Sequence, residues 1–297
     1  MDVRHLSLLR ELADRGSVAA VAQATHRTPS AVSQQLRTAE RALRVRLVEP
    51  AGRGIRLTDA GRLLAEAAGD VEATLAAVQA RLDEFRGRPV GTVRIAALAS
   101  AAEFLLPAVT GELAAEGIEV ELTDIDVSEG DYARWAADHD IVIGHSLAGP
   151  VPADASTLAH RVLAREPIDV ALPARHPLAR KEILNPRDVV DETWIGVPTG
   201  YPFATLLEAV ERSAGRPAHV AQRLRDNRLV RSYVATGAGI AMLPRFTTLV
   251  DDDVVLRPLR GVNAKRWVVA LSRPDRAERA VVRRTVTRLR AIGRAAE

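Results

Sequence analysis

The chain has 297 residues, enough for about two domains of ordinary size, and 47% of them are apolar, so each domain can bury a core. It contains no cysteine, which excludes disulfides, thiolate metal ligands and thiol redox sensing. No apolar run of roughly 18 residues indicates a membrane span, and the start lacks the apolar stretch of a signal peptide. We therefore expect a cytoplasmic protein.

Positive charge is concentrated at the N-terminal end. Residues 1–60 hold ten arginines, no lysine and six acidic residues, a net charge of +4. Residues 61–90 carry four arginines against five acids, a net charge of −1, and the whole chain carries +3, which leaves residues 91–297 neutral. A basic N-terminal segment on an otherwise nearly neutral chain suggests that this segment binds a polyanionic partner. A nonspecific DNA binder would instead carry basic charge along its whole length.

The first 60 residues are predicted to form short helices followed by a hairpin. Helices are expected over 5–14, 18–24 and 29–43, and short strands over 46–49 and 55–57. Gly16 ends the first helix, Ser17 caps the second, and Thr28 caps the third with Pro29 at its first position. This order of elements is that of a winged helix-turn-helix.

The third helix has one apolar and one polar face. At 100° per residue, Val32, Leu36, Ala39 and Leu43 fall together and form its buried side. The opposite side carries residues suited to the major groove, where an amide can pair with adenine, a guanidinium with guanine, and a hydroxyl with base edges or phosphate. These residues are Ser30, Ser33, Gln34, Arg37 and Arg41. Taken alone, the polar face could equally be a solvated surface without a partner.

Phosphate contacts are expected around this helix. Free backbone N–H groups at its start, by Thr28 and Ser30, suit an anion. Arg53 and Arg56 lie on the predicted hairpin, where phosphate or minor-groove contact is expected. Thr28, Pro29, Ser30, Ser33, Gln34, Arg37, Arg53 and Arg56 are therefore the predicted DNA-binding residues.

A long helix is predicted from Thr58 to about Arg86. Its apolar positions alternate by four and three residues, as in a coiled-coil seam: Leu64, Ala68, Val71, Leu75, Val78, Leu82 and Phe85. This pattern requires a partner helix and predicts a dimer. The alternative is an amphipathic helix packed on its own domain. Gly87, Pro89 and Gly91 break the helix and form a linker.

The remainder alternates strands and helices, which indicates an α/β fold in two similar halves. A helix is expected over 101–115, and strands over 92–98, 118–125, 141–143, 168–172, 194–197, 240–243 and 267–271. Gly237 and Gly239 resemble part of a dinucleotide fingerprint, but Met242 occupies the third glycine position. We expect these glycines to form a turn between a helix and a strand.

Three stretches in the first 61 residues closely resemble the LysR-type transcriptional regulators. They are Gly-Ser-Val-Ala-Ala-Val-Ala at 16–22, Thr-Pro-Ser-Ala-Val-Ser-Gln-Gln-Leu at 28–36 and Leu-Thr-Asp-Ala-Gly at 57–61. The resemblance continues more loosely through the rest of the chain. One departure is Leu-Val-Glu-Pro at 47–50, where the family usually has Leu-Phe-Glu-Arg. Val48 is a smaller wedge under the wing, and Pro50 removes a basic phosphate contact.

The resemblance implies three segments. Residues 1–60 would be a winged helix-turn-helix DNA-binding domain and residues 61–90 a linker and dimerisation helix. Residues 91–297 would be a periplasmic-binding-protein-like effector domain with two α/β lobes. Lobe I would span about 91–164 and 264–297, and lobe II about 165–263. The implied partners are double-stranded promoter DNA, a small-molecule effector, further copies in a homodimer or homotetramer and, indirectly, RNA polymerase.

The effector is expected between the lobes, at loops that follow strands. The resemblance points to Ser100, Thr199, Gly200 and Thr236, and His145 lies just beyond the strand at 141–143. Backbone N–H groups at helix starts favour a carboxylate. As alternatives, Ser100 and Thr199 would only cap helices, and His145 would be an ordinary packed or solvated histidine.

Two other classes of function compete with a regulator. An enzyme would need a catalytic motif, and the chain shows no nucleophile elbow, no phosphate-binding loop and no His-x-x-x-His pair. We therefore expect no enzymatic activity, no cofactor and no metal. An exported solute-binding protein shares the α/β fold but would need a signal peptide and no DNA-reading domain.

Overall fold

The computed structural model describes residues 2–52, 54–87, 89–125, 132–153 and 155–297. Its N-terminal domain consists of three helices and a hairpin: α1 (Val3–Arg15), α2 (Val18–Ala24), α3 (Pro29–Leu43), β1 (Val48–Ala51) and β2 (Gly54–Leu57). The predicted caps are confirmed. Ser17 accepts from the Ala20 amide at 3.2 Å, and Thr28 from the Ala31 amide at 3.2 Å. The winged helix-turn-helix is therefore present.

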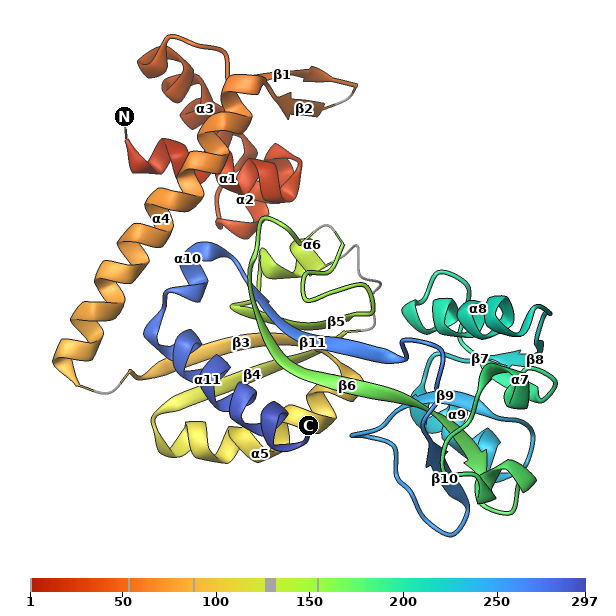
Figure 1. Ribbon diagram of the computed structural model, residues 1–297. Coiled ribbons are helices and arrows are strands. Elements are labelled where there is room, and N and C mark those ends of the chain that lie inside the picture. Colours follow the sequence, from red (N-terminus) through yellow and green to blue (C-terminus); the bar gives the residue numbers. More distant parts are fainter. Residues whose placement is uncertain (1, 53, 88, 126–131, 154) are drawn as a thin grey trace.

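Helix α4 (Asp59–Arg86) runs from this domain to the rest of the chain (Figure 1). It has two apolar faces. Small residues on one face, Ala65, Ala68 and Ala80, are buried against the chain itself. Larger side chains, Leu75, Val78, Leu82 and Phe85, are 40–89% exposed. At 100° per residue the two faces are about 120° apart. The helix thus packs on its own chain and also leaves an apolar row free.

Lobe I is a sheet covered by helices. Its strands lie in the order β6-β11-β5-β3-β4, with β3 parallel to β4 and β5, and β11 antiparallel to β5 and β6. Helices α5 and α11 pack together beside this sheet (Figure 1). The elements are β3 (Gly91–Leu98), α5 (Ala99–Ala115), β4 (Ile118–Ile125), α6 (Tyr132–Ala136), β5 (Ile141–Ser146), β6 (Ala159–Pro173), β11 (Lys265–Ser272), α10 (Pro274–Ala277) and α11 (Ala280–Ala295).

Lobe II contains two sheets. In the first, the C-terminal end of β6 pairs with β9 and β10. The second consists of β7 and β8. Its elements are η2 (Pro177–Arg180), α7 (Pro186–Val189), β7 (Thr193–Gly196), α8 (Pro202–Ala214), β8 (His219–Arg223), α9 (Asn227–Ala235), β9 (Ala241–Pro244) and β10 (Val254–Arg257). Gly237 has a φ of +80°, and a Cβ at Gly239 would lie 2.6 Å from the Thr193 oxygen. The predicted turn is therefore confirmed.

The predicted strands differ from the observed ones in a way that matters for the site. The strand expected at 168–172 is the end of β6, one strand of 15 residues that runs through both lobes. Strand β5 extends to Ser146, so His145 lies within a strand and not beyond it. The proposed lobe boundary near 164 falls inside β6 and stays a prediction. No helix in the part of the chain that is described is long and apolar enough to cross a membrane.

Candidate functional site

Helix α3 exposes the polar face that the sequence predicted. Val32, Leu36 and Ala39 are buried in the core of the N-terminal domain. On the outside, Nη2 of Arg37 donates a 2.8 Å hydrogen bond to Oε1 of Gln34. Of the other predicted residues, Thr28, Pro29 and Ser30 are exposed at the helix start and Ser33 is half-buried. The helix therefore presents hydroxyl, amide and guanidinium groups on one outward surface.

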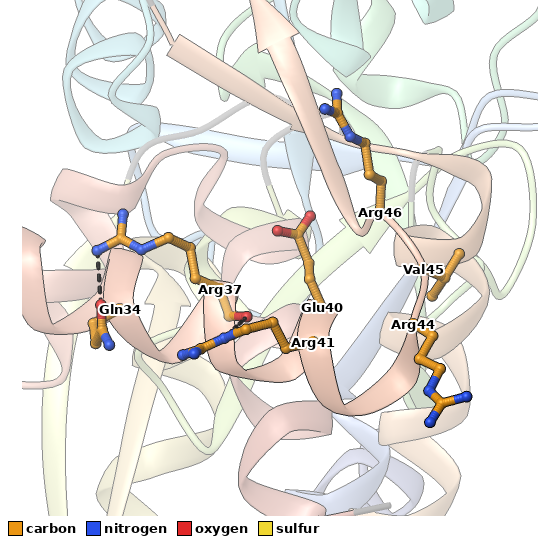
Figure 2. Close-up of a pocket in the computed structure, with 7 residues that line it drawn as sticks. All are labelled: Gln34, Arg37, Glu40, Arg41, Arg44, Val45 and Arg46. Carbon is orange, nitrogen blue, oxygen red and sulfur yellow. Dashed lines mark hydrogen bonds between the residues drawn. The ribbon is translucent and has the colours of Figure 1, made fainter.

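A cationic concavity of about 610 Å³ lies at the other end of this helix (Figure 2). Its lining, the basic groove below, comprises Gln34, Arg37, Glu40, Arg41, Arg44, Val45 and Arg46. Glu40 is its one acidic residue, and its Oε1 accepts hydrogen bonds from the backbone N–H groups of Leu47 and Val48, at 2.9 and 3.4 Å. Glu40 thus fixes the turn into the hairpin, and four arginines give the groove its charge.

Arg44 has an unusual backbone conformation for its residue type. It is the C-cap of α3, with φ +54° and ψ +34°, in the left-handed region where glycine is the common choice. A non-glycine residue there is strained, and such strain is retained mainly where the side chain is used. Arg44 and Arg46 were not predicted as site residues, although three arginines within residues 41–46 are a visible signal.

In the described part of the hairpin, the positive charge of Arg56 is less free than expected. Arg56 pairs across the hairpin with Glu49, Nε to Oε1 at 2.7 Å, and remains 67% exposed. Arg53, also predicted to contact DNA, lies outside the described residues. The N-terminal domain therefore offers cations chiefly from α3 and from the segment that follows it.

A second site lies where the two lobes meet. Arg266, on β11, is 1% exposed and Glu166, on β6, is fully buried. Nε of Arg266 donates to Oε2 of Glu166 at 2.7 Å. Nη1 of Arg266 donates to Oγ of Ser100 at 2.9 Å and lies 3.2 Å from Nδ1 of His145. We call Ser100, His145, Glu166 and Arg266 the interlobe cluster.

His145 accepts from Arg266 only as a neutral imidazole. Its burial and the nearby Arg266 charge lower the pKa of His145 to about 3. The hydroxyl of Tyr132 receives a 3.1 Å hydrogen bond from the His145 amide, which fixes this part of β5. A Cβ at Gly144 would lie 2.6 Å from the Tyr132 ring, so this contact requires glycine. The histidine is thus a rigidly held, uncharged acceptor.

Lobe II closes over the interlobe cluster. The Phe203 ring, from α8, lies 5.6 Å from the His145 ring and 5.9 Å from the Arg266 guanidinium. The Phe246 amide donates to Oε1 of Glu166 at 2.7 Å. Nη2 of Arg266 is 2.6 Å from Glu166 but has no hydrogen-bonded acceptor among the described residues. Guanidinium groups form their strongest hydrogen bonds with anionic acceptors.

The structure brings two of the five predicted effector residues together, Ser100 and His145, which both contact Arg266. Ser100 does not cap α5, whose N-cap is Leu98 without a side-chain cap bond, so the capping alternative was wrong. Thr199 and Gly200 are exposed in the turn before α8. Thr236 hydrogen-bonds back to the Tyr233 carbonyl at 2.8 Å as the C-cap of α9. No hydrogen bond between described residues joins these three to the interlobe cluster.

The winged helix-turn-helix and the two-lobed α/β domain define the class, a DNA-binding protein with a ligand-binding domain. Residues 3–62 match the model of the bacterial regulatory helix-turn-helix protein, lysR family. Residues 86–293 match the LysR substrate binding domain. These two matches together cover most of the chain.

Curated relatives and solved structures agree with these models. The transcriptional dual regulator GltC of Bacillus subtilis is 28% identical over 253 residues, 83% of this chain and 82% of its own. The regulator CbbR of Xanthobacter flavus is 26% identical, over 92% of this chain and 83% of its own. A full-length OxyR variant from Pseudomonas aeruginosa shares the fold with a TM-score of 0.68 at 17% identity, over 99% of this chain and 97% of its own.

The chain belongs to the LysR family of transcriptional regulators. It is a DNA-binding transcription regulator with a helix-turn-helix domain and an effector-binding domain.

Proposed function

We propose that α3 reads the operator through Ser30, Ser33, Gln34 and Arg37. These residues share the outward face of a helix whose inward face is buried, which supports insertion into the major groove. Thr28 and Pro29 set the start of this helix, where free backbone N–H groups can hold a phosphate. Arg44 and Arg46 of the basic groove, with Arg53 and Arg56 of the wing, would hold the DNA backbone.

The effector in this proposal is a small anion, most simply a carboxylate, that binds at the interlobe cluster. The observation that carries the proposal is the position of Arg266, a buried cation between the lobes whose Nη2 is ion-paired with Glu166 at 2.6 Å but makes no hydrogen bond of regular geometry to a described residue. Ser100 and neutral His145 already accept from Arg266 and give the site its polar lining. Thr199, Gly200 and Thr236 would border the ligand only after a rearrangement. For comparison, the Synechocystis CcmR regulatory domain was solved in complex with 2-PG, with a TM-score of 0.53 and 20% identity, over 61% of this chain and 87% of that domain.

The assembly in this proposal is a homodimer, or a tetramer built from two dimers, held together through the exposed apolar row of α4. The dimer would present two α3 helices to a two-fold operator. Effector binding would change operator spacing or bending and so, indirectly, the access of RNA polymerase. The chain would act in the cytoplasm by binding alone, without catalysis, since the relatives reported above are regulators.

The experiment for this function is fluorescence anisotropy of the full-length protein on DNA from upstream of its own gene. A scrambled fragment serves as competitor. If the protein does not bind the DNA from upstream of its own gene, genome-wide selection of bound fragments follows. Tight binding that resists the competitor supports the regulator. If the selection returns no preferred fragment, the proposal of a sequence-specific regulator is wrong.

A thermal-shift screen of mono- and dicarboxylates tests the ligand site separately. A carboxylate that stabilises the wild-type protein should lose its effect in Arg266→Met combined with Glu166→Gln. That double variant removes both buried charges and keeps the acceptor for the Phe246 amide. An unchanged shift in the double variant would place the carboxylate elsewhere.

A further inference from the structure

A buried arginine joins the N-terminal domain to lobe I. Arg273 directly follows β11, and its side chain is 6% exposed. Its Nη1 lies 2.9 Å from Oε1 of Glu11 and 3.2 Å from Oδ2 of Asp14, both on α1. Its Nη2 donates to Oε2 of Glu72, on α4, at 3.0 Å. One lobe I side chain thus holds three carboxylates of the N-terminal domain and the linker helix.

Neighbouring groups extend this contact. We call the whole set the Arg273 cluster; it comprises Glu11, Asp14, Arg15, Glu72, Asp138 and Arg273. Nη2 of Arg15, on α1, pairs with Asp138 of lobe I at 2.8 Å, and its Nε pairs with Glu11 at 2.6 Å. Burial acts to raise the pKa of Glu11, but its bonds to Arg15 and Arg273 hold it below the ordinary value. Glu11 therefore remains ionised near neutral pH. Arg273 and its three carboxylate partners are largely buried, so their attraction is weakly screened.

The strand that ends at Arg273 begins at the interlobe cluster. Arg266 is the second residue of β11, and Arg273 follows its last residue. Seven residues of extended strand cover about 23 Å. Over this length β11 pairs with β5 on one side and β6 on the other. Figure 1 shows β11 running from lobe II to α10, which lies beside α4.

We propose that β11 transmits the state of the interlobe cluster to the N-terminal domain, with Arg273 as the point of attachment. This rests on the proposed effector site only in naming an anion as the natural trigger. An anion that draws Arg266 away from Glu166 shifts β11 against β6. Arg273 carries that shift to α1 and α4, and so changes the angle at which α3 is presented to DNA.

The absence of cysteine allows a direct test by distance measurement. Spin labels are attached to cysteines introduced at Ala42, at the end of α3, and at Ala114, on α5, both exposed. Pulsed electron–electron double resonance then gives the distance between the label on the N-terminal domain and the label on lobe I in the full-length protein. Labelled chains are diluted with unlabelled ones, so that distances between subunits do not contribute.

Two variants and a matched control carry the first part of the test. Arg273→Met should broaden the distance distribution or shift it by several ångströms. Arg284→Met is the control, because Arg284 pairs with Glu116 through two bonds within lobe I and does not reach the N-terminal domain. Glu72→Gln removes one negative charge of the cluster and replaces Arg273→Met if that variant does not fold. A wild-type distribution in a folded Arg273→Met or, failing that, Glu72→Gln protein would overturn the proposal.

The second part tests transmission without any ligand. Arg266→Met with Glu166→Gln changes the interlobe cluster directly, and it should shift the distance in the wild-type background but not in Arg273→Met. The same shift in both backgrounds, or a shift in neither, would refute transmission through Arg273. Because no effector is added, failure of the carboxylate screen leaves this result intact.

Discussion

Gln34 and Arg37 are joined on the outer face of α3 by a 2.8 Å hydrogen bond from Nη2 to Oε1. The bond fixes the amide orientation, so that the amide nitrogen of Gln34 remains free to donate. Donor and acceptor groups held in place before binding lose less side-chain entropy when they meet a base edge. The pair therefore defines one recognition unit and not two independent side chains.

Gln34→Ala is expected to weaken binding to the specific operator by about 1–3 kcal/mol and to leave binding to random DNA nearly unchanged. Anisotropy titrations on both DNAs measure the difference. The comparison variant is Gln35→Ala, since the Gln35 amide donates to the Arg4 carbonyl at 3.1 Å and does not belong to the recognition face. Equal losses on both DNAs would remove Gln34 from base reading.

Arg44 offers a prediction in which stability and binding change in opposite directions. Arg44→Gly relieves the left-handed backbone strain and should stabilise the N-terminal domain by about 1 kcal/mol. Arg44→Ala keeps the strain and removes the same cation. Both variants should weaken binding to every DNA sequence, and the slope of log affinity against log salt should fall by about one. Thermal unfolding and salt titrations test this, and an unaltered salt slope would show that Arg44 does not contact phosphate.

The N-terminal domain could be predicted closely because its signals are local. Caps at Ser17 and Thr28, and the 3.6-residue period of α3, depend on neighbours within one or two turns. The second site could be predicted only in part. Ser100 and His145 were found, but their position around a common partner depends on strands far apart in the sequence.

Arg266 was missed for a physical reason. Between Lys265 and Trp267, just before the strand predicted at 267–271, it looks like an ordinary exposed residue. Its burial follows from the register that places it opposite Glu166, exactly 100 residues earlier in the chain, on β6. No local period shows such a pairing. Similarly, the heptad of α4 predicted one apolar face, whereas the helix has two, because the small alanines that are buried against the chain itself carry little hydrophobic signal.

The exposed row on α4 leads to a test of assembly. Leu75 is 54% exposed at the start of this row, and a charge there would be buried without a partner in a dimer. Leu75→Asp should reduce the mass measured by light scattering to that of a single chain, or to half of any larger assembly. Ala77→Asp introduces the same charge about 120° from the row and from the buried face alike, and it should keep the wild-type mass. If both variants keep it, the row is not the dimer seam.

His145 gives the chain a specific dependence of stability on pH. Its pKa is about 3 in the folded protein, against about 6.5 when unfolded. Between these values only the unfolded state takes up the proton, so stability is lost as the pH falls below about 6.5. From pH 7 to pH 5 the loss from this group is about 2 kcal/mol. Above pH 7 it contributes no slope.

His145→Asn keeps an acceptor for Arg266 and cannot be protonated in this range, so the variant should lose less stability on acidification. Urea unfolding at pH 7 and pH 5, followed for wild type and variant together, measures the difference. Carboxylates elsewhere titrate alike in both proteins and cancel in the comparison. A matching loss in wild type and variant would mean that His145 is protonated in the folded state. In that case Arg266 would face a second cation and not a neutral acceptor, and the interlobe cluster would attract anions still more strongly at low pH.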